Sequence, residues 1–255
     1  MSYKWQTPDT ESSYLNSRNI MDFTDFRNIV AAEFPSVTAE QLSRFEAMAG
    51  LYREWNSRIN VVSRKDIDNL YEHHLLHSLG IALYLKYQRP EVFTEWGGET
   101  LVAGSSGPAA DVGPVTVLDL GCGGGFPGMP LATLFPSVRF TLCDSIGKKI
   151  TVAREVAAAL GLGNVGTVNA RAESLPGPYG YVVSRAVTSL DKFLPWVRGK
   201  YTGGVFYLKG GDLVEEIALA MGKFRLQKGS VSVWPLSSVL KDGFFDGKMV
   251  VDIKN

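Results

Sequence analysis

The chain is poor in the residues that mark secreted, membrane-spanning or metal-binding proteins. Its 255 residues include two cysteines, Cys122 and Cys143, which are too few for a disulfide framework and belong to no CxxC or Cys/His ligand pattern. Charges or glycines interrupt every apolar stretch well before the roughly 20 residues that a spanning helix needs. The first residues, MSYKWQTPDTESS, lack the apolar run of a signal peptide. We therefore expect a cytoplasmic protein with reduced thiols, no membrane contact and no bound metal.

A charge excess of either sign is also missing. Lys+Arg and Asp+Glu are balanced at 26 each, and the hydrophobic fraction of 45% is typical of a globular protein. A nucleic acid would therefore have to bind a local basic patch rather than a generally positive surface. We expect modest RNA affinity with a shallow salt dependence.

The sequence divides into segments of different periodicity. Residues 1–20 are polar and are expected to form a loose N-terminal extension, whereas residues 21–94 carry apolar side chains at helical spacing and predict a helical cap. Thr38, with Gln41 three residues later, matches a capping box at a helix start. Residues 95–114 are rich in Gly, Ala, Ser and Pro, which predicts a flexible linker. A second domain is expected over residues 115–255.

In this second part, strand and helix patterns alternate. Seven short apolar runs are the predicted strands, and the last two are expected to pair antiparallel: VTVLDL, VRFTLCD, NVGTVNA, GYVVSR, GGVFYLKG, FRLQKGSVSVW and KMVVDIK. Strand followed by helix, repeated, is typical of a mostly parallel sheet with helices on both faces. We predict an α/β fold with a doubly wound, seven-stranded, Rossmann-like sheet and an N-terminal helical cap.

The clearest ligand-binding signal is a glycine cluster after the first predicted strand. Gly121, Gly123 and two neighbouring glycines follow an apolar strand and open a helix, so that bare backbone can approach a ligand closely. The cluster also matches GxGxxG, a weak pattern that would suggest a dinucleotide. Asp119, just before the cluster, suits the ammonium group of a methionine moiety and would repel a pyrophosphate. Asp144, at the end of the next strand, suits ribose hydroxyls, so S-adenosylmethionine is the favoured cofactor.

Residues and motifs that the chain lacks reduce the number of candidate classes of methyl acceptor. Methylation of a pyrimidine carbon needs a cysteine nucleophile, and neither cysteine is placed for it. Amine methyltransferases commonly carry an Asp/Asn-Pro-Pro-aromatic segment where this chain has Val183-Ser184-Arg185-Ala186. A purine ring nitrogen such as guanine N7 has its own lone pair and no proton to lose, so alignment without a general base would suffice.

Basic side chains near the predicted strand ends are candidate substrate contacts. Arg185 can fork onto a phosphate or onto a guanine edge, and Lys209 suits a phosphate. Lys148 and Lys149, which open the helix after Asp144, and Arg64 in the cap are further RNA-contact candidates. An ordinary solvated surface charge is the alternative for each of them, and Arg185 is the strongest candidate of the set because its guanidinium can fork onto a ligand.

The three histidines, His73, His74 and His77, lie in one predicted helix. Zinc would need further ligands, and no HExxH motif or nearby cysteine supplies them. We expect the imidazoles to line the inner side of the cap, where His74 would face the substrate, with a purely structural, hydrogen-bonded role as the alternative.

These motifs together resemble one known family. They are Glu54-Trp55-Asn56 with Asn60-Val-Val-Ser63, His74-Leu-Leu-His77-Ser78-Leu79, Asp119-Leu-Gly-Cys-Gly-Gly-Gly-Phe-Pro-Gly128, Asp144-Ser145-Ile-Gly-Lys148-Lys149, Ser184-Arg185-Ala186 and Leu208-Lys209-Gly210. The chain resembles the bacterial small-subunit ribosomal RNA guanine-N7 methyltransferases, the glucose-inhibited division protein B family, from about Tyr52 to Ile253. In this family Arg-His-x-x-Asp-Ser is commoner at the position of His73-His74-Leu-Leu-His77-Ser78.

The resemblance implies methyl transfer from S-adenosylmethionine to N7 of one guanine in 16S rRNA, free or within the 30S subunit. It also implies that Gly121 and Phe126 contact the cofactor, that Ala172 and Glu173 border its adenine, and that Arg185 acts in the cofactor or substrate site.

Several alternatives remain open from the sequence alone. They are a methyltransferase for a small molecule, an RNA- or ribosome-binding protein that keeps the cofactor only as a ligand, and a nicotinamide oxidoreductase. The residues do not settle the oligomeric state, for which we favour a monomer.

Overall fold

The computed structural model describes residues 20–99 and 113–254. Almost all of the predicted N-terminal extension, residues 1–20, and most of the predicted linker, residues 95–114, lie outside these ranges.

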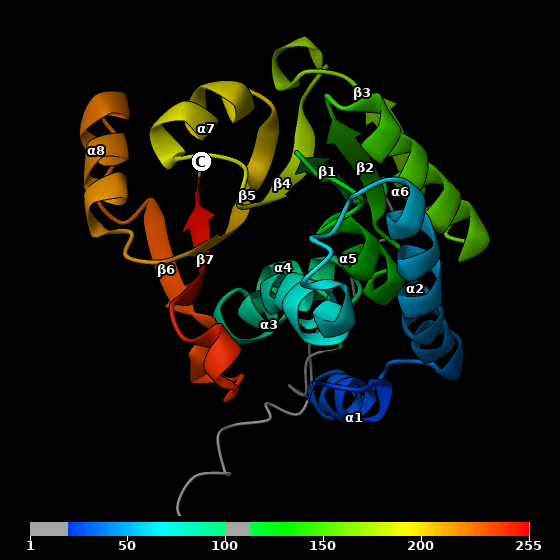
Figure 1. Cartoon of the computed structure of the whole chain (residues 1–255). Coiled ribbons are helices and arrows are strands. Elements are labelled where there is room, and N and C mark those ends of the chain that lie inside the picture. Colours follow the sequence, from blue (N-terminus) through cyan, green and yellow to red (C-terminus); the bar gives the residue numbers. More distant parts are fainter. Residues whose placement is uncertain (1–19, 100–112, 255) are drawn as a thin grey trace, which may run out of the picture.

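A seven-stranded sheet forms the centre of the described part of the chain (Figure 1). Its strands lie in the order β3-β2-β1-β4-β5-β7-β6. The first five pair in parallel, and β7 runs antiparallel to both β5 and β6, which confirms the predicted sheet and its antiparallel end pair. The strands are β1 (Thr116–Leu120), β2 (Arg139–Asp144), β3 (Val165–Asn169), β4 (Tyr179–Arg185), β5 (Tyr201–Gly210), β6 (Val231–Pro235) and β7 (Lys248–Ile253).

Helices cover both faces of the sheet, as predicted. Successive strand residues point to opposite faces, so Leu118 and Val182 pack with α7 and α8, whereas Val117 and Val183 pack with the other helices. The helices are α1 (Phe23–Glu33), α2 (Ala39–Arg58), α3 (His77–Gln88), α4 (Pro90–Glu95), α5 (Gly128–Leu134), α6 (Gly147–Ala159), α7 (Leu190–Val197) and α8 (Val214–Phe224). None of the helices within these described residues is long and apolar enough to cross a membrane.

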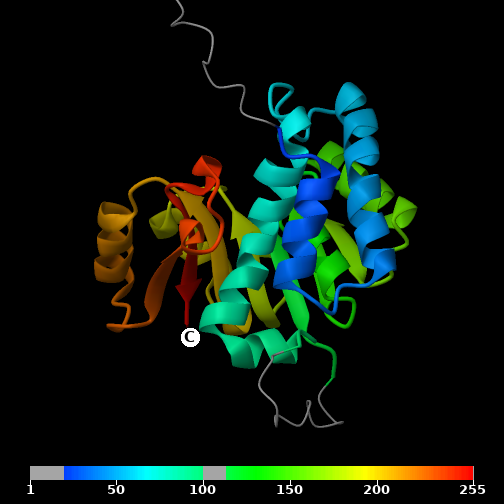
Figure 2. The same ribbon diagram turned by 90° about the horizontal axis from the view of Figure 1, so that it is seen from below.

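The N-terminal helices pack on one face of the sheet and share a core with it. Phe26, Phe45 and Leu79 belong to the same buried cluster as Val117 and Phe206. Figure 2 shows α1 and α3, coloured blue and cyan, lying across this face. The helices predicted as a cap, residues 21–94, are therefore built into the sheet domain on one side.

Local capping fixes the start of α2 as the sequence predicts. Thr38 Oγ1 accepts from the backbone N–H of Gln41 at 3.2 Å, and Gln41 Oε1 accepts from the N–H of Thr38 at 2.8 Å. The amide of Gln41 also donates to the carbonyls of Thr133 and Leu134, each at 2.9 Å. The same side chain thus caps α2 and ties it to α5.

The folded core extends further than the predicted linker boundary. Helix α4 ends at Glu95, and the next residue, Trp96, is fully buried. Glu95 accepts a hydrogen bond from the hydroxyl of Tyr181 in β4, and the N–H of Gly98 donates to Phe93 O. The prediction that the linker begins at residue 95 was wrong, because one buried tryptophan outweighs the loop-like composition around it.

Candidate functional site

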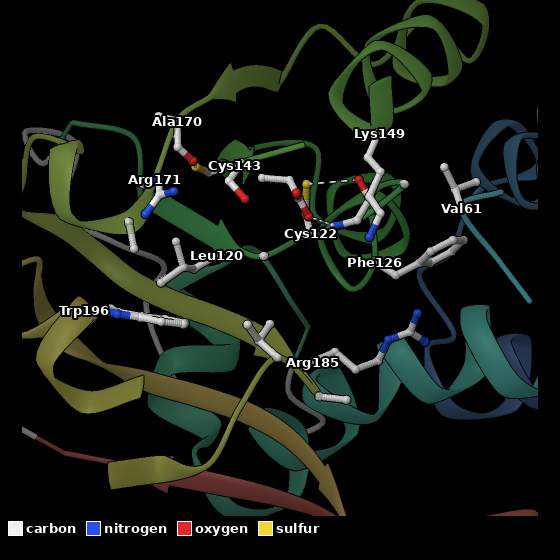
Figure 3. Close-up of a pocket in the computed structure, with 18 of the residues that line it drawn as sticks. Val61, Leu120, Cys122, Phe126, Cys143, Lys149, Ala170, Arg171, Arg185 and Trp196 are labelled. Atoms are coloured by element: carbon white, nitrogen blue, oxygen red, sulfur yellow. Dashed lines mark hydrogen bonds between the residues drawn. The ribbon is translucent and has the colours of Figure 1, made fainter. Parts of the chain in front are cut away.

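A cavity of about 680 Å³ lies at the carboxyl ends of β1, β2 and β4 (Figure 3). The strand order reverses here between β1 and β4, which is where doubly wound sheets bind ligands. Its lining residues come from the glycine loop and from the segments that follow β2, β3 and β4. They are Val61, Leu120, Gly121, Cys122, Gly123, Gly124, Phe126, Cys143, Asp144, Ser145, Lys149, Ala170, Arg171, Ala172, Glu173, Arg185, Ala186, Val187 and Trp196.

The glycine loop after β1 adopts backbone conformations that favour glycine. Gly121, Gly123 and Gly125 have φ values of +73°, +58° and +120°, in the region that side chains rarely occupy. A Cβ at Gly121 would lie 2.5 Å from the side chain of Val187, whereas a Cβ at Gly123 would meet nothing within 4 Å. Gly123 therefore presents bare backbone to open space at the cavity wall.

Asp119 lies beneath this loop rather than in the cavity wall. Its side chain is completely buried, and Oδ2 accepts from the N–H of Gly128 at 2.7 Å. Oδ1 is buried without a hydrogen-bond partner among the described residues. Burial raises the pKa of Asp119 to about 7, although the Gly128 N–H and Arg185 act in the opposite direction. Asp119 thus supports the start of α5, and its predicted contact with a methionine ammonium stays a prediction.

Asp144 lies in the cavity wall at the end of β2. Its Oδ2 accepts from the N–H of Gly123 at 3.0 Å, and its Oδ1 accepts from the N–H of Ile146 at 2.8 Å. An ionised carboxylate has about four acceptor positions, so this side chain can still accept from ligand hydroxyls. The same carboxylate therefore shapes the glycine loop and faces the cavity.

The other predicted cofactor residues meet around the same cavity. Phe126, at the end of the glycine loop, lies with Arg185 at one end, and Trp196 lies at the other (Figure 3). Ala172 and Glu173 form a short helical turn after β3 that also lines the cavity. The structure thus brings together predicted residues from four separate segments of the sequence.

Arg185, the last residue of β4, is held on several sides. Its Nη1 donates to the carbonyl of His73 at 3.2 Å, and its Nη2 is 3.0 Å from Nδ1 of His74. The guanidinium carbon lies 5.1 Å from the centre of the Phe126 ring, within the range of a cation–π contact. Burial lowers the pKa of Arg185 to about 10, with the Asp119 carboxylate acting against this shift.

The predicted substrate contacts separate into different environments. Lys149 lines the cavity, whereas Lys148 and Arg64 are exposed outside the lining. Lys209 is only 9% exposed, and its ammonium is paired with Glu216 and donates to Thr188 O at 2.9 Å. A phosphate could contact Lys209 only after the ion pair between Lys209 and Glu216 is broken. The structure therefore does not support the prediction that Lys209 binds a phosphate.

The histidines lie in and beside a π-helical segment, Leu70–Leu76, that runs directly into α3. Such segments are rare and are frequent at functional sites. His74 contacts Arg185 at the cavity end, His73 stacks on Phe244 with ring centres 3.7 Å apart, and His77 is buried. Within residues 20–99 and 113–254, no group of three or more His, Cys, Asp or Glu side chains is arranged to hold a metal ion.

Three residues of the site carried no signal in the sequence. The hydroxyl of Tyr52 donates to Gly124 O at 2.9 Å, and its ring lies 4.7 Å from that of Phe126. Asp66 accepts from His74, and Trp196 closes the far end of the cavity. Tyr52 fits the apolar face of a helix, and Asp66 lies in a polar connection, so only the folded arrangement reveals their place.

Comparison with known proteins identifies the family. A family described as rRNA small subunit methyltransferase G matches residues 106–239. The protein named Ribosomal RNA small subunit methyltransferase G from Christiangramia forsetii is 43% identical to this chain over 226 residues, which cover 86% of this chain and 92% of the relative. The protein of the same name from Bacteroides fragilis is 44% identical over 226 residues, which cover 86% of this chain and 95% of the relative. The protein of that name from Porphyromonas gingivalis is 43% identical over 232 residues, covering 88% of this chain and 91% of the relative. The chain therefore belongs to the rRNA small subunit methyltransferase G family.

Proposed function

We propose that this enzyme transfers the methyl group of S-adenosylmethionine to N7 of one guanine in 16S rRNA of the small ribosomal subunit, in the cytoplasm. The observation that carries the proposal is the cavity at the reversal point of the sheet. It has a bare glycine wall, the acceptor Asp144 along one side and the donor Arg185 at one end. Family membership supports the same reaction class.

The residues present fit S-adenosylmethionine. The volume of about 680 Å³ lies within the range of about 300 to 1,000 Å³ that is common for small-molecule sites. Gly123 leaves open space where any other residue would place a Cβ. Asp144, whose carboxylate faces the cavity, would hold the ribose hydroxyls. When bound, the cofactor would supply an electrophilic methyl group on a sulfonium.

The chain's own residues suit an acceptor that needs alignment rather than deprotonation. Guanine N7 attacks through its own lone pair, so the protein has no proton to remove at this atom. Arg185 is always a donor, and its guanidinium can hydrogen-bond the O6 side of a guanine or a neighbouring phosphate. His74 is neutral because burial and Arg185 lower its pKa to about 4, so it adds no second positive charge beside Arg185.

The RNA contact is proposed to be local. Lys149 and Arg171 lie in the cavity lining, and Arg64 and Lys148 are exposed outside it. Since the whole chain has a formal net charge of 0, these cations are expected to give a shallow salt dependence of binding. We propose 16S rRNA or the 30S subunit as the partner that they contact.

A methyl-transfer assay tests the proposal. The purified protein is incubated with methyl-tritiated S-adenosylmethionine and with 30S subunits or naked 16S rRNA from cells that lack the enzyme. After digestion to nucleosides, label is expected in 7-methylguanosine only. Subunits from cells that contain the enzyme are the matched control and should accept little label. Cofactor binding without label on either RNA substrate would contradict the proposed function and favour a small acceptor or a non-catalytic protein.

A further inference from the structure

A hydrogen-bonded chain of side chains links the partly exposed carboxylate of Asp66 to Arg185 in the cavity lining. Asp66 Oδ2 lies 2.8 Å from His74 Nε2, and His74 Nδ1 lies 3.0 Å from Arg185 Nη2. We propose that Asp66 and His74 are positioning residues that hold the Arg185 guanidinium at the cavity end in its working orientation. This inference rests on the proposed function, and it assigns Asp66 and His74 a role on the protein side rather than a contact with substrate.

Donor and acceptor chemistry allows one arrangement of protons along this chain. A guanidinium has only N–H donors, so His74 Nδ1 must accept from Arg185. The imidazole proton then lies on Nε2 and is donated to Asp66 Oδ2. Asp66 therefore selects the tautomer of His74 that can bind Arg185, because a proton on Nδ1 would face the guanidinium and remove the bond.

Asp66 itself is fixed by a second histidine. Its Oδ1 lies 2.5 Å from Nδ1 of His73, and the His73 ring stacks on Phe244. The carbonyl of His73 accepts from Arg185 Nη1. Both oxygens of one carboxylate thus hold consecutive histidines, and both histidines hold Arg185.

The burial of these groups suits a preorganised arrangement. Arg185 is partly buried in the cavity lining, and the His74 and Asp66 side chains are 12% and 30% exposed. The two described hydrogen bonds of Arg185 use two of its five N–H groups, so the others are available to a ligand. A long arginine side chain loses much rotamer freedom when it is held in one place, and Asp66 and His74 supply that restraint before substrate binds.

Substitution of Asp66 tests the inference. Asp66→Ala removes the acceptor for His74 Nε2–H, and we expect kcat on 30S subunits to fall by about 10-fold to 100-fold, the range in which small misplacements of a catalytic group act. Affinity for S-adenosylhomocysteine should stay within about 2-fold, since Asp66 does not line the cavity. Asp68→Ala is the matched control, because Asp68 lies two residues away, is 67% exposed and pairs only loosely with Arg53 at 3.4 Å.

Asp66→Asn is the conservative variant. Its carbonyl oxygen can accept from His74 Nε2–H while its amide donates to His73 Nδ1, so we expect most of the turnover to return. Nitrogen-15 NMR of the imidazoles gives a readout independent of activity. In the wild type, His74 should be the neutral tautomer with its proton on Nε2, and Asp66→Ala should give a mixture of tautomers.

The outcomes separate this inference from the proposed function. Wild-type turnover in Asp66→Ala, equal loss in Asp66→Asn and Asp66→Ala, or a His74 proton on Nδ1 in the wild type would each overturn the positioning role. If the wild-type protein transfers no methyl group to 30S subunits, the proposed function fails, while the NMR measurement still decides whether Asp66 fixes His74.

Discussion

Substitution of Gly123 by alanine separates the folding role of the glycine loop from its binding role. Gly123 has φ +58°, and an added Cβ would meet no atom within 4 Å. The folding cost is therefore the backbone conformation alone, about 1 to 2 kcal/mol for a residue with a side chain. Reduced freedom of the unfolded chain returns about 0.4 to 1 kcal/mol, so the free energy of unfolding should fall by about 1 kcal/mol.

The effect on binding should be larger, because the new methyl group occupies space beside the cavity. The wall that Gly123 forms would no longer admit a ligand against its backbone, and we expect affinity for S-adenosylhomocysteine to fall at least about 10-fold, equivalent to about 1.4 kcal/mol. Isothermal titration calorimetry measures the affinity, and urea denaturation measures the stability.

Gly199→Ala is the matched control. Gly199 has φ +73°, its Cβ would likewise meet nothing within 4 Å, and it lies outside the cavity lining. The two variants should lose similar stability, but only Gly123→Ala should lose affinity. Unchanged affinity in Gly123→Ala, or the same loss of affinity in both variants, would show that the backbone of Gly123 does not form the ligand-binding wall.

Three further substitutions test the site and the core. Burial raises the pKa of Asp119 from 3.8 to about 7, so its folded form keeps a proton that the unfolded chain releases. The free energy of unfolding of the wild type should therefore decline as pH rises from about 4 to 7. Urea denaturation should show that Asp119→Asn gains up to about 4 kcal/mol relative to the wild type across that pH range. A difference in unfolding free energy that does not change with pH would contradict this. Gly128→Ala would place a Cβ 2.2 Å from the Leu142 side chain and should lower the free energy of unfolding by about 1 to 3 kcal/mol through overpacking. If this variant is as stable as the wild type, the start of α5 can move to make room. Trp96→Ala should cost about 3 to 5 kcal/mol in the same assay because the ring is fully buried, and a loss below about 1 kcal/mol would restore the linker interpretation.

The sheet and the glycine loop could be predicted from the sequence because their signals are local. The run VTVLDL followed by glycines predicts a strand that ends in a close backbone approach, and the structure has β1 and the cavity wall there. Thr38 and Gln41 are three residues apart, so their capping box needs no tertiary information. Parallel strands bring their carboxyl ends to one edge, which explains why residues from distant segments meet at the cavity.

The connections between distant residues could not be predicted in this way. Arg185 and His74 are 111 residues apart, and their contact depends on where the π-helical segment Leu70–Leu76 lies relative to the end of β4. The pairing of Lys209 with Glu216 likewise depends on where α8 lies relative to the end of β5, which the local sequence pattern does not give. Trp96 was assigned to a linker because composition averages over neighbouring residues. In the structure its ring is buried in the core directly after α4, a single contact that composition does not detect.

The proposed reaction adds one methyl group to guanine N7 in 16S rRNA. The most direct measurement is the 7-methylguanosine content of 16S rRNA, determined by mass spectrometry of nucleosides, from cells that lack the gene and from the same cells complemented with the wild-type chain or with Gly123→Ala. We expect one more 7-methylguanosine per 16S rRNA with the wild-type chain than in the cells that lack it, and a clear reduction with Gly123→Ala. Equal 7-methylguanosine content in the deleted and the complemented cells would show that this chain does not methylate guanine N7 in 16S rRNA.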